Sequence, residues 1–143
     1  MTIKNDADLS DNVCFAVYSA SNAIVRAYRP LLEEYELTYP QYLVMQALWC
    51  QNEISMTKLS EFTRLDLGTL TPIVKRLENK NFLSRMKDKH DARKKVISVT
   101  KLGRNIERSA TELKQKLMNS VDLSNEDFEL LRTMCLKVVA ELK

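Results

Sequence analysis

The chain has 143 residues and a formal net charge of +3, with only two glycines and three prolines. This length suffices for one domain with its own hydrophobic core, and so little glycine and proline favours helix. No apolar run reaches the length of a membrane span and the first residues lack a secretory pattern, so we expect a soluble, cytoplasmic protein with no membrane partner. Three cysteines should then be free thiols, and a single histidine argues against a metal site or histidine-based catalysis.

Residues 9–35 are predicted to form one long helix, because apolar residues recur there at intervals of three or four. Pro30 should bend or divide it, since proline removes a backbone hydrogen bond. A second apolar stripe that includes Cys14 and Tyr28 lies beside the first. One covered face does not account for two stripes, so we expect this helix to pack inside its own subunit and against a second copy of the chain.

Residues 38–50 predict a second helix, with Thr38 and Gln41 spaced as a capping box and Pro40 in the tolerant first turn. A short strand is expected at residues 54–56. A brief helix should follow it.

That brief helix covers residues 56–63, with Leu59 and Phe62 turned inward. After a turn, residues 67–80 predict a longer helix with one buried face. Its apolar positions have the helical spacing of three and four: Leu70, Ile73, Val74 and Leu77.

Short alternating apolar patterns at residues 82–86 and 96–99, separated by a polar run, predict a two-stranded hairpin. Two short helices joined by a tight turn and followed by a hairpin make a winged helix-turn-helix, here residues 54–100. The expected fold class is therefore mainly α with a small β-hairpin wing.

Two helices are predicted to close the chain. Thr100 can cap one that runs from Lys101 to about Val121. Ser124 with Asp127 can start the last.

Positive charge is concentrated in residues 75–104. This segment holds eleven Lys or Arg against three acidic residues, a net +8, which leaves −5 for the rest because the whole chain carries +3. Such segregation is expected of a surface that meets a polyanion. A helix paired with a basic hairpin narrows that polyanion to double-stranded DNA.

Two groups of side chains are candidates for DNA contact. The first lies on the exposed side of the 67–80 helix, where hydroxyls and cations can reach base edges or phosphate: Thr69, Thr71, Lys75 and Arg76. The second lies near the tip of the hairpin: Lys87, Lys89, Arg93, Lys94 and Lys95. Two alternatives stay open, that the helix cations are only a solvated face and that Asp91 pairs with Arg93 to stiffen the loop.

Cys14 has two interpretations. A cysteine on an apolar stripe can be a small core residue. Alternatively, nearby phenols could donate hydrogen bonds to its sulfur, favour the thiolate and so favour attack on a peroxide. Tyr28 lies fourteen residues away, about 21 Å along a continuous helix. If these two residues touch, Tyr28 comes from a partner subunit.

Several segments agree, in order, with one known family. They read CFAVYS from Cys14, AYRPLL from Ala27, LTYPQYL from Leu37, LW from Leu48, LGTLTP from Leu67 and DAR from Asp91. Together they resemble the organic hydroperoxide resistance regulators, the OhrR type within the MarR family.

The resemblance implies a homodimeric winged-helix repressor in which residues 1–143 form one MarR-type domain. Residues 9–35 and 101–143 would be dimerisation helices. Cys14 would be the reactive cysteine, held across the dimer by Tyr28 and Tyr39. Oxidation by an organic hydroperoxide would release a pseudo-palindromic operator, and no cofactor is implied.

One departure concerns the second thiol that some members use to form a disulfide with the sensor. Cys135 lies further toward the end of the chain than that pattern leads us to expect, so we favour chemistry at one cysteine, in which oxidised Cys14 is trapped by a small cellular thiol or oxidised further. A bond to Cys135 is the alternative.

Two other functions are alternatives. The chain could be a MarR-type regulator released by a phenolic or other small ligand, with Cys14 inert. It could also be a thiol peroxidase, although no catalytic arginine or resolving pair surrounds Cys14 and the basic hairpin would then have no purpose.

Overall fold

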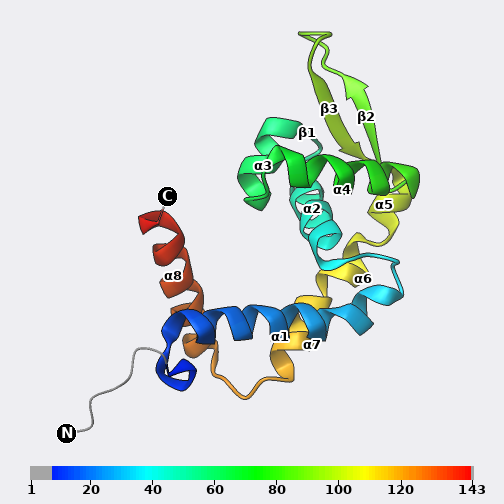
Figure 1. The fold of residues 1–143 in the computed structure, drawn as a ribbon. Helices are drawn as coiled ribbons and strands as arrows, with labels where there is room; N and C mark the ends of the chain where they lie inside the picture. The colour runs from blue at the N-terminus through cyan, green and yellow to red at the C-terminus, as the bar shows by residue number, and fades with distance from the viewer. Residues whose placement is uncertain (1–7, 143) are drawn as a thin grey trace, which may run out of the picture. The chain divides into compact units, whose positions relative to one another are not determined.

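The computed structural model describes residues 8–142 and divides the chain into two compact units, Met1–Leu113 and Lys114–Lys143. The elements of the larger unit run from blue to yellow in Figure 1. They are η1 (Leu9–Asp11), α1 (Val13–Glu33), α2 (Tyr39–Cys50), β1 (Glu53–Ser55), α3 (Met56–Thr63), α4 (Leu67–Asn79), β2 (Leu83–Lys87), β3 (Lys95–Val99), α5 (Lys101–Asn105) and α6 (Glu107–Thr111). The helix α7 (Leu113–Asn119) crosses the boundary, and α8 (Asn125–Glu141) lies in the smaller unit. The reading of residues 1–143 as one domain stays a prediction.

The first helix begins later than predicted. Asn12 has an extended backbone and its side chain accepts a hydrogen bond from Phe15 N at 2.9 Å, so it caps α1 and leaves Leu9–Asp11 as a separate 3-10 turn. Pro30 does not divide the helix, which continues to Glu33. Burial of side chains on either side of the proline offsets the one backbone hydrogen bond that it removes.

The capping box of α2 forms as predicted. Thr38 Oγ1 accepts from Gln41 N at 3.3 Å, and Gln41 Oε1 accepts from Thr38 N at 3.1 Å. Most of α2 is buried, and its Tyr42, Met45 and Leu48 are almost fully enclosed. This helix therefore lies at the centre of the larger unit.

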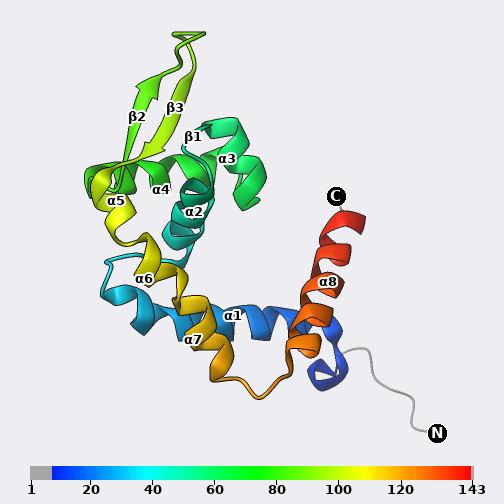
Figure 2. The same ribbon diagram turned by 180° about the vertical axis from the view of Figure 1, so that it is seen from behind.

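The winged helix-turn-helix is confirmed, and its sheet has three strands in the order β1-β3-β2 (Figure 2). The predicted short strand pairs with β3, with Ile54 opposite Ile97, both buried. The hairpin strands β2 and β3 pair in antiparallel register from Leu83–Val99 to Lys87–Lys95.

One inward position was predicted wrongly in α3. Phe62 is 57% exposed, whereas Leu59 is fully buried. The less exposed residues of α3 are Met56, Leu59, Ser60 and Thr63, which follow the spacing of one helix face. Phe62 lies beside that row.

The predicted helix from Lys101 to about Val121 is broken into α5, α6 and α7. Its cap is correct, because Thr100 Oγ1 accepts from Gly103 N at 3.1 Å. Each break comes shortly after a backbone carbonyl that accepts a hydrogen bond from a side chain of α2. Trp49 Nε1 donates to Gly103 O at 3.1 Å, and the Tyr42 hydroxyl donates to Ala110 O at 3.0 Å. In a regular helix each carbonyl accepts from the backbone N–H four residues later, and the side-chain donor competes with that bond.

The smaller unit consists mainly of α8, which starts at the predicted capping box of Ser124 and Asp127. No residue of α8 is buried. Its exposed apolar side chains include Leu130, Met134 and Val138. Among residues 8–142 no helix is both long and apolar enough to cross a membrane.

Gly103 tests how closely α5 approaches the sheet. A Cβ at this position would collide with the Phe82 carbonyl oxygen and lie 2.7 Å from Val99 Cγ1. We predict that Gly103→Ala lowers the free energy of unfolding by about 3 kcal/mol, as overpacking against backbone does. Urea denaturation at a fixed protein concentration measures this.

Gly68→Ala is the matched control. Its Cβ would meet only the end of the Asp66 side chain, at 3.3 Å, and the higher helix propensity of alanine adds at most about 1 kcal/mol of stability. Equal losses in the two variants would contradict the close approach at Gly103.

Candidate nucleic-acid interface and thiol site

The helix α4 has one buried and one exposed face, as predicted. Leu70, Ile73, Val74 and Leu77 are buried. The four predicted DNA-contacting residues are all exposed: Thr69, Thr71, Lys75 and Arg76. The Thr71 hydroxyl donates to Leu67 O at 2.7 Å, so this side chain can offer a methyl group and an acceptor to DNA but not its proton.

An ion pair that the sequence did not reveal holds the hairpin to α4. Arg85 on β2 donates through Nη2 and Nε to the two oxygens of Glu78 at 3.0 and 3.2 Å. Hydrogen bonding from Arg85 lowers the pKa of the Glu78 carboxyl, with the positive charge of Arg85 adding to this effect. The pair fixes the base of the wing on the recognition helix.

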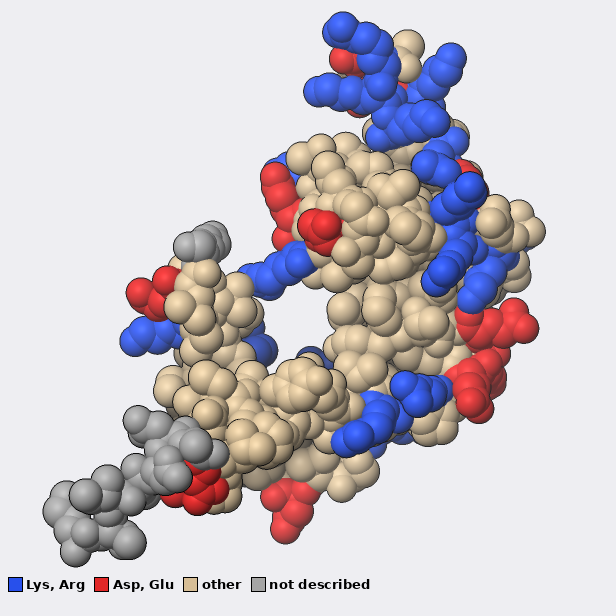
Figure 3. Space-filling view, in the orientation of Figure 1, with Lys and Arg blue, Asp and Glu red and all other residues tan. Residues whose placement is uncertain are grey.

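The predicted wing cations, Lys87, Lys89, Arg93 and Lys94, are all exposed. Figure 3 shows blue side chains gathered over the projecting hairpin and at its base. Asp91 Oδ1 accepts from Arg93 N at 3.0 Å and from Arg93 Nε at 3.2 Å, so the loop-stiffening pair exists. The Arg93 side chain is nevertheless 92% exposed, and within residues 8–142 its Nη atoms have no partner. The pair therefore leaves Arg93 able to contact DNA.

Three tyrosines gather where α1 meets the start of α2. The ring centroid of Tyr28 lies 5.1 Å from that of Tyr39 and 5.5 Å from that of Tyr42. The Tyr42 hydroxyl is already occupied, since it donates to Ala110 O and accepts from Gln46. The Tyr28 and Tyr39 hydroxyls make no hydrogen bond within the described part of the chain. The structure thus brings the two predicted tyrosines together and leaves both hydroxyls available.

Cys14 does not join its own tyrosines. It is exposed in the first turn of α1, and α1 runs without a break to Tyr28. Fourteen residues of continuous helix separate the two residues by about 21 Å. Within one chain Cys14 therefore lies far along α1 from Tyr28 and its partner ring, Tyr39.

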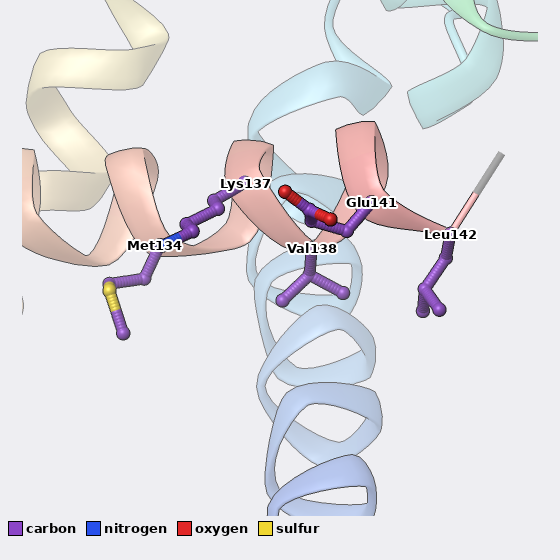
Figure 4. Close-up of a pocket in the computed structure, with 5 residues that line it drawn as sticks. All are labelled: Met134, Lys137, Val138, Glu141 and Leu142. Carbon is purple, nitrogen blue, oxygen red and sulfur yellow. The ribbon is translucent and has the colours of Figure 1, made fainter.

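The other thiols lie elsewhere. Cys50 is exposed at the end of α2, and Cys135 is partly exposed on α8, in the smaller unit. A shallow depression on the last turns of α8 is lined by Met134, Lys137, Val138, Glu141 and Leu142 (Figure 4). All five residues come from one helix, so this is an open helix face and not an enclosed ligand site.

The sequence also did not reveal a hydrogen bond between Lys80 and Gln41 in the first turn of α2. Gln41 is a buried polar residue with only 3% exposure, and Lys80 donates to its Oε1 at 3.1 Å. The sequence predicts Gln41 as the capping-box partner of Thr38, but nothing local to the sequence pairs it with a residue 39 positions away.

Known proteins resemble this chain along most of its length. A family model described as "Transcriptional regulator SarA/Rot" matches residues 26–109. The HTH-type transcriptional regulator SarZ of Staphylococcus epidermidis is 36% identical over 123 residues, 86% of this chain and 83% of SarZ. The organic hydroperoxide resistance transcriptional regulator of Bacillus subtilis is 33% identical over 125 residues, 87% of this chain and 85% of that protein.

Solved structures share the fold. The structure of reduced AbfR bound to DNA has 25% sequence identity and a TM-score of 0.78, covering 94% of this chain and 95% of AbfR. A MarR variant from E. coli complexed with operator DNA has 21% identity and a TM-score of 0.80, covering 94% and 99% of the two chains.

The relatives named here are transcriptional regulators, so the alternative of a thiol peroxidase is set aside. The exposed face of α4 and the basic wing are the parts of this chain suited to contact DNA. With a winged helix-turn-helix, a matching family model over more than half of its length and relatives above 30% identity, the chain belongs to the SarA/Rot-type regulators of the MarR family, which bind DNA and are not enzymes.

Proposed function

We propose that this protein is a cytoplasmic, homodimeric repressor that senses organic hydroperoxides through Cys14 and releases its operator when that thiol is oxidised. The observation that carries the proposal is the pair formed by Tyr28 and Tyr39. Their rings pack together and their hydroxyls have no partner in the described residues, while Cys14, which shares α1 with Tyr28, lies about 21 Å from Tyr28. A two-fold partner can supply the missing thiol.

The exposed apolar surface supports a dimer. On η1 and α1 the side chains of Leu9, Val13, Phe15, Val17, Tyr18 and Ile24 are 41–73% exposed. On α8, described separately, Leu130, Leu131, Met134, Leu136, Val138 and Val139 are 38–62% exposed. Apolar surface of this extent on terminal helices is typical of an interface between subunits.

The helix α4 and the wing, together called the reading head below, would make the DNA contacts. In a symmetric dimer, two α4 helices would enter successive major grooves of a pseudo-palindromic site. Thr69, Thr71, Lys75 and Arg76 would face base edges and phosphate. The wing cations Lys87, Lys89, Arg93 and Lys94 would lie along the flanking backbone or minor groove.

The tyrosine hydroxyls are suited to hold a thiolate. Burial, with the neighbouring Tyr42 and Tyr39 adding to it, raises the pKa of Tyr28 to about 12, and burial also raises the pKa of Tyr39. Both phenols therefore keep their protons at physiological pH. A protonated phenol donates to a thiolate and so favours the charged, nucleophilic form of the partner's Cys14.

Oxidation would proceed by attack of the Cys14 thiolate on the outer oxygen of the hydroperoxide. The O–O bond breaks, the alcohol leaves after taking up a proton, and Cys14 becomes a sulfenic acid. A small thiol then replaces the hydroxyl, forming a mixed disulfide and water. The added group would end the tyrosine hydrogen bonds and enlarge a packed interface, which changes the distance between the two reading heads.

Operator binding with and without cumene hydroperoxide tests the proposal. We predict that the peroxide weakens operator binding by wild-type protein at least tenfold and leaves Cys14→Ser protein bound. Cys50→Ser is the matched control and should respond like wild type. Release of Cys14→Ser by the peroxide would refute the sensing role.

Intact mass of the released protein identifies the trap. A small thiol added to Cys14 is expected when that thiol is present. A cross-linked dimer that disappears in Cys135→Ser would instead support the alternative disulfide.

Tyr28 gives a pH prediction. In the unfolded chain this phenol ionises near its ordinary value of 10.0, and in the folded protein near 12. The stability that it contributes is therefore complete below pH 10 and lost as the pH rises through 12. Tyr28→Phe should reduce the phenolate absorbance that appears near pH 12 and flatten the loss of stability above pH 10.

Tyr18→Phe is the control, because Tyr18 is 66% exposed and lies outside the cluster. This variant should keep the phenolate absorbance that appears near pH 12. An unchanged titration in Tyr28→Phe would contradict the assignment.

A further inference from the structure

Lys80 ends the recognition helix and reaches back to the corner that carries the tyrosine pair. It is the C-cap residue of α4. Its Nζ donates to the backbone carbonyl of Glu36 and, at 3.1 Å, to Gln41 Oε1. Glu36 lies in the connection between α1 and α2 with a left-handed backbone, φ 56°. One ammonium group thus joins the end of α4 to the α1–α2 connection and to the first turn of α2.

The acceptor at Gln41 is shared. The same Oε1 atom accepts from Thr38 N at 3.1 Å and closes the capping box of α2. Gln41 is 3% exposed, so losing one of these donors leaves a buried acceptor partly unpaired. The position of Lys80 and the start of α2 are therefore linked through one oxygen atom.

Tyr39 is the first residue of α2 and lies between Thr38 and Gln41 in the same capped turn. Its ring packs against Tyr28 of α1. A displacement of the tyrosine pair thus acts on the turn to which the end of α4 is tied. Packed elements joined in this way move between discrete arrangements.

We propose that Lys80 is a positioning residue of the DNA interface, which sets the orientation of α4 and transmits the state of the tyrosine pair to it without touching DNA. The transmission rests on the proposed sensing function, whereas the positioning does not. The rival reading is that Lys80, like other cations of α4, contacts a phosphate.

Salt dependence separates the two readings. A lysine that contacts phosphate lowers the slope of log affinity against log salt by about 1 when it is removed. A positioning lysine changes the affinity and leaves that slope unchanged. We predict that Lys80→Met, which keeps the aliphatic stem, weakens operator binding about tenfold with the wild-type slope. Lys75→Met, from the exposed face, should reduce the slope by about 1.

A second route to the same link guards against a folding artefact. Gln41→Met removes the acceptor and should weaken operator binding to a similar degree. The double variant, Lys80→Met with Gln41→Met, should bind the operator about as tightly as either single variant. Lys80→Arg keeps the donors and should restore much of the affinity. Circular dichroism and the thermal midpoint confirm that each variant is folded. A reduced slope in Lys80→Met, or full additivity with Gln41→Met, would overturn the positioning role.

The transmission is tested by the ratio of operator affinities before and after cumene hydroperoxide. The ratio should move toward 1 in Lys80→Met and stay at the wild-type value in Lys75→Met. An unchanged ratio in Lys80→Met would refute transmission through Lys80. If wild-type protein shows a ratio of 1, the sensing function fails, and the salt experiment still decides the positioning role.

Discussion

The length of one continuous helix constrains the rest of the account. Cys14 and Tyr28 both belong to α1, whose hydrogen-bonded rise keeps them about 21 Å apart. Pro30 lies beyond both residues and does not interrupt the segment between them. A chemical link between this thiol and this phenol therefore needs a second chain. The proposed thiol chemistry therefore requires the proposed dimer, and the two stand or fall together.

The helix α2 connects the tyrosine pair to the reading head. Its first turn carries Tyr39 and the capping box, and its buried Tyr42 and Trp49 donate to carbonyls of the segment after the wing. Lys80 ties the end of α4 to the same first turn. Each contact pairs a buried polar group with a fixed partner, which limits the ways in which the core can rearrange. Under the proposal, a change at the tyrosines would therefore act on α4.

Local patterns predicted local structure well. The capping residues Thr38 and Ser124 are predicted from partners three positions away, Thr100 from its place before the helix, and the buried face of α4 from its periodicity. The errors arose from distant contacts. Trp49 and Tyr42 donate to carbonyls beside the breaks in the helix after Thr100 from 54 and 68 positions away, which no local window contains.

In the candidate site, too, local features were predictable from the sequence and distant contacts were not. Exposure of the α4 and wing cations followed from spacing and charge, whereas the Lys80–Gln41 contact and the Glu78–Arg85 pair needed the fold. The pairing of Tyr28 with Tyr39 came from family resemblance, because two tyrosines eleven positions apart in different helices carry no signal of their own.

Subunit mixing tests the central claim most directly. One subunit type carries Cys14→Ser with both tyrosines intact, and the other keeps Cys14 but carries Tyr28→Phe and Tyr39→Phe. A mixed dimer would then hold one complete site, made of the thiol of one chain and the phenols of the other. The account predicts that the rate of Cys14 oxidation in the mixed dimer returns to the wild-type rate per site, well above that of the double-phenylalanine homodimer. A mixed dimer as slow as that homodimer would contradict it.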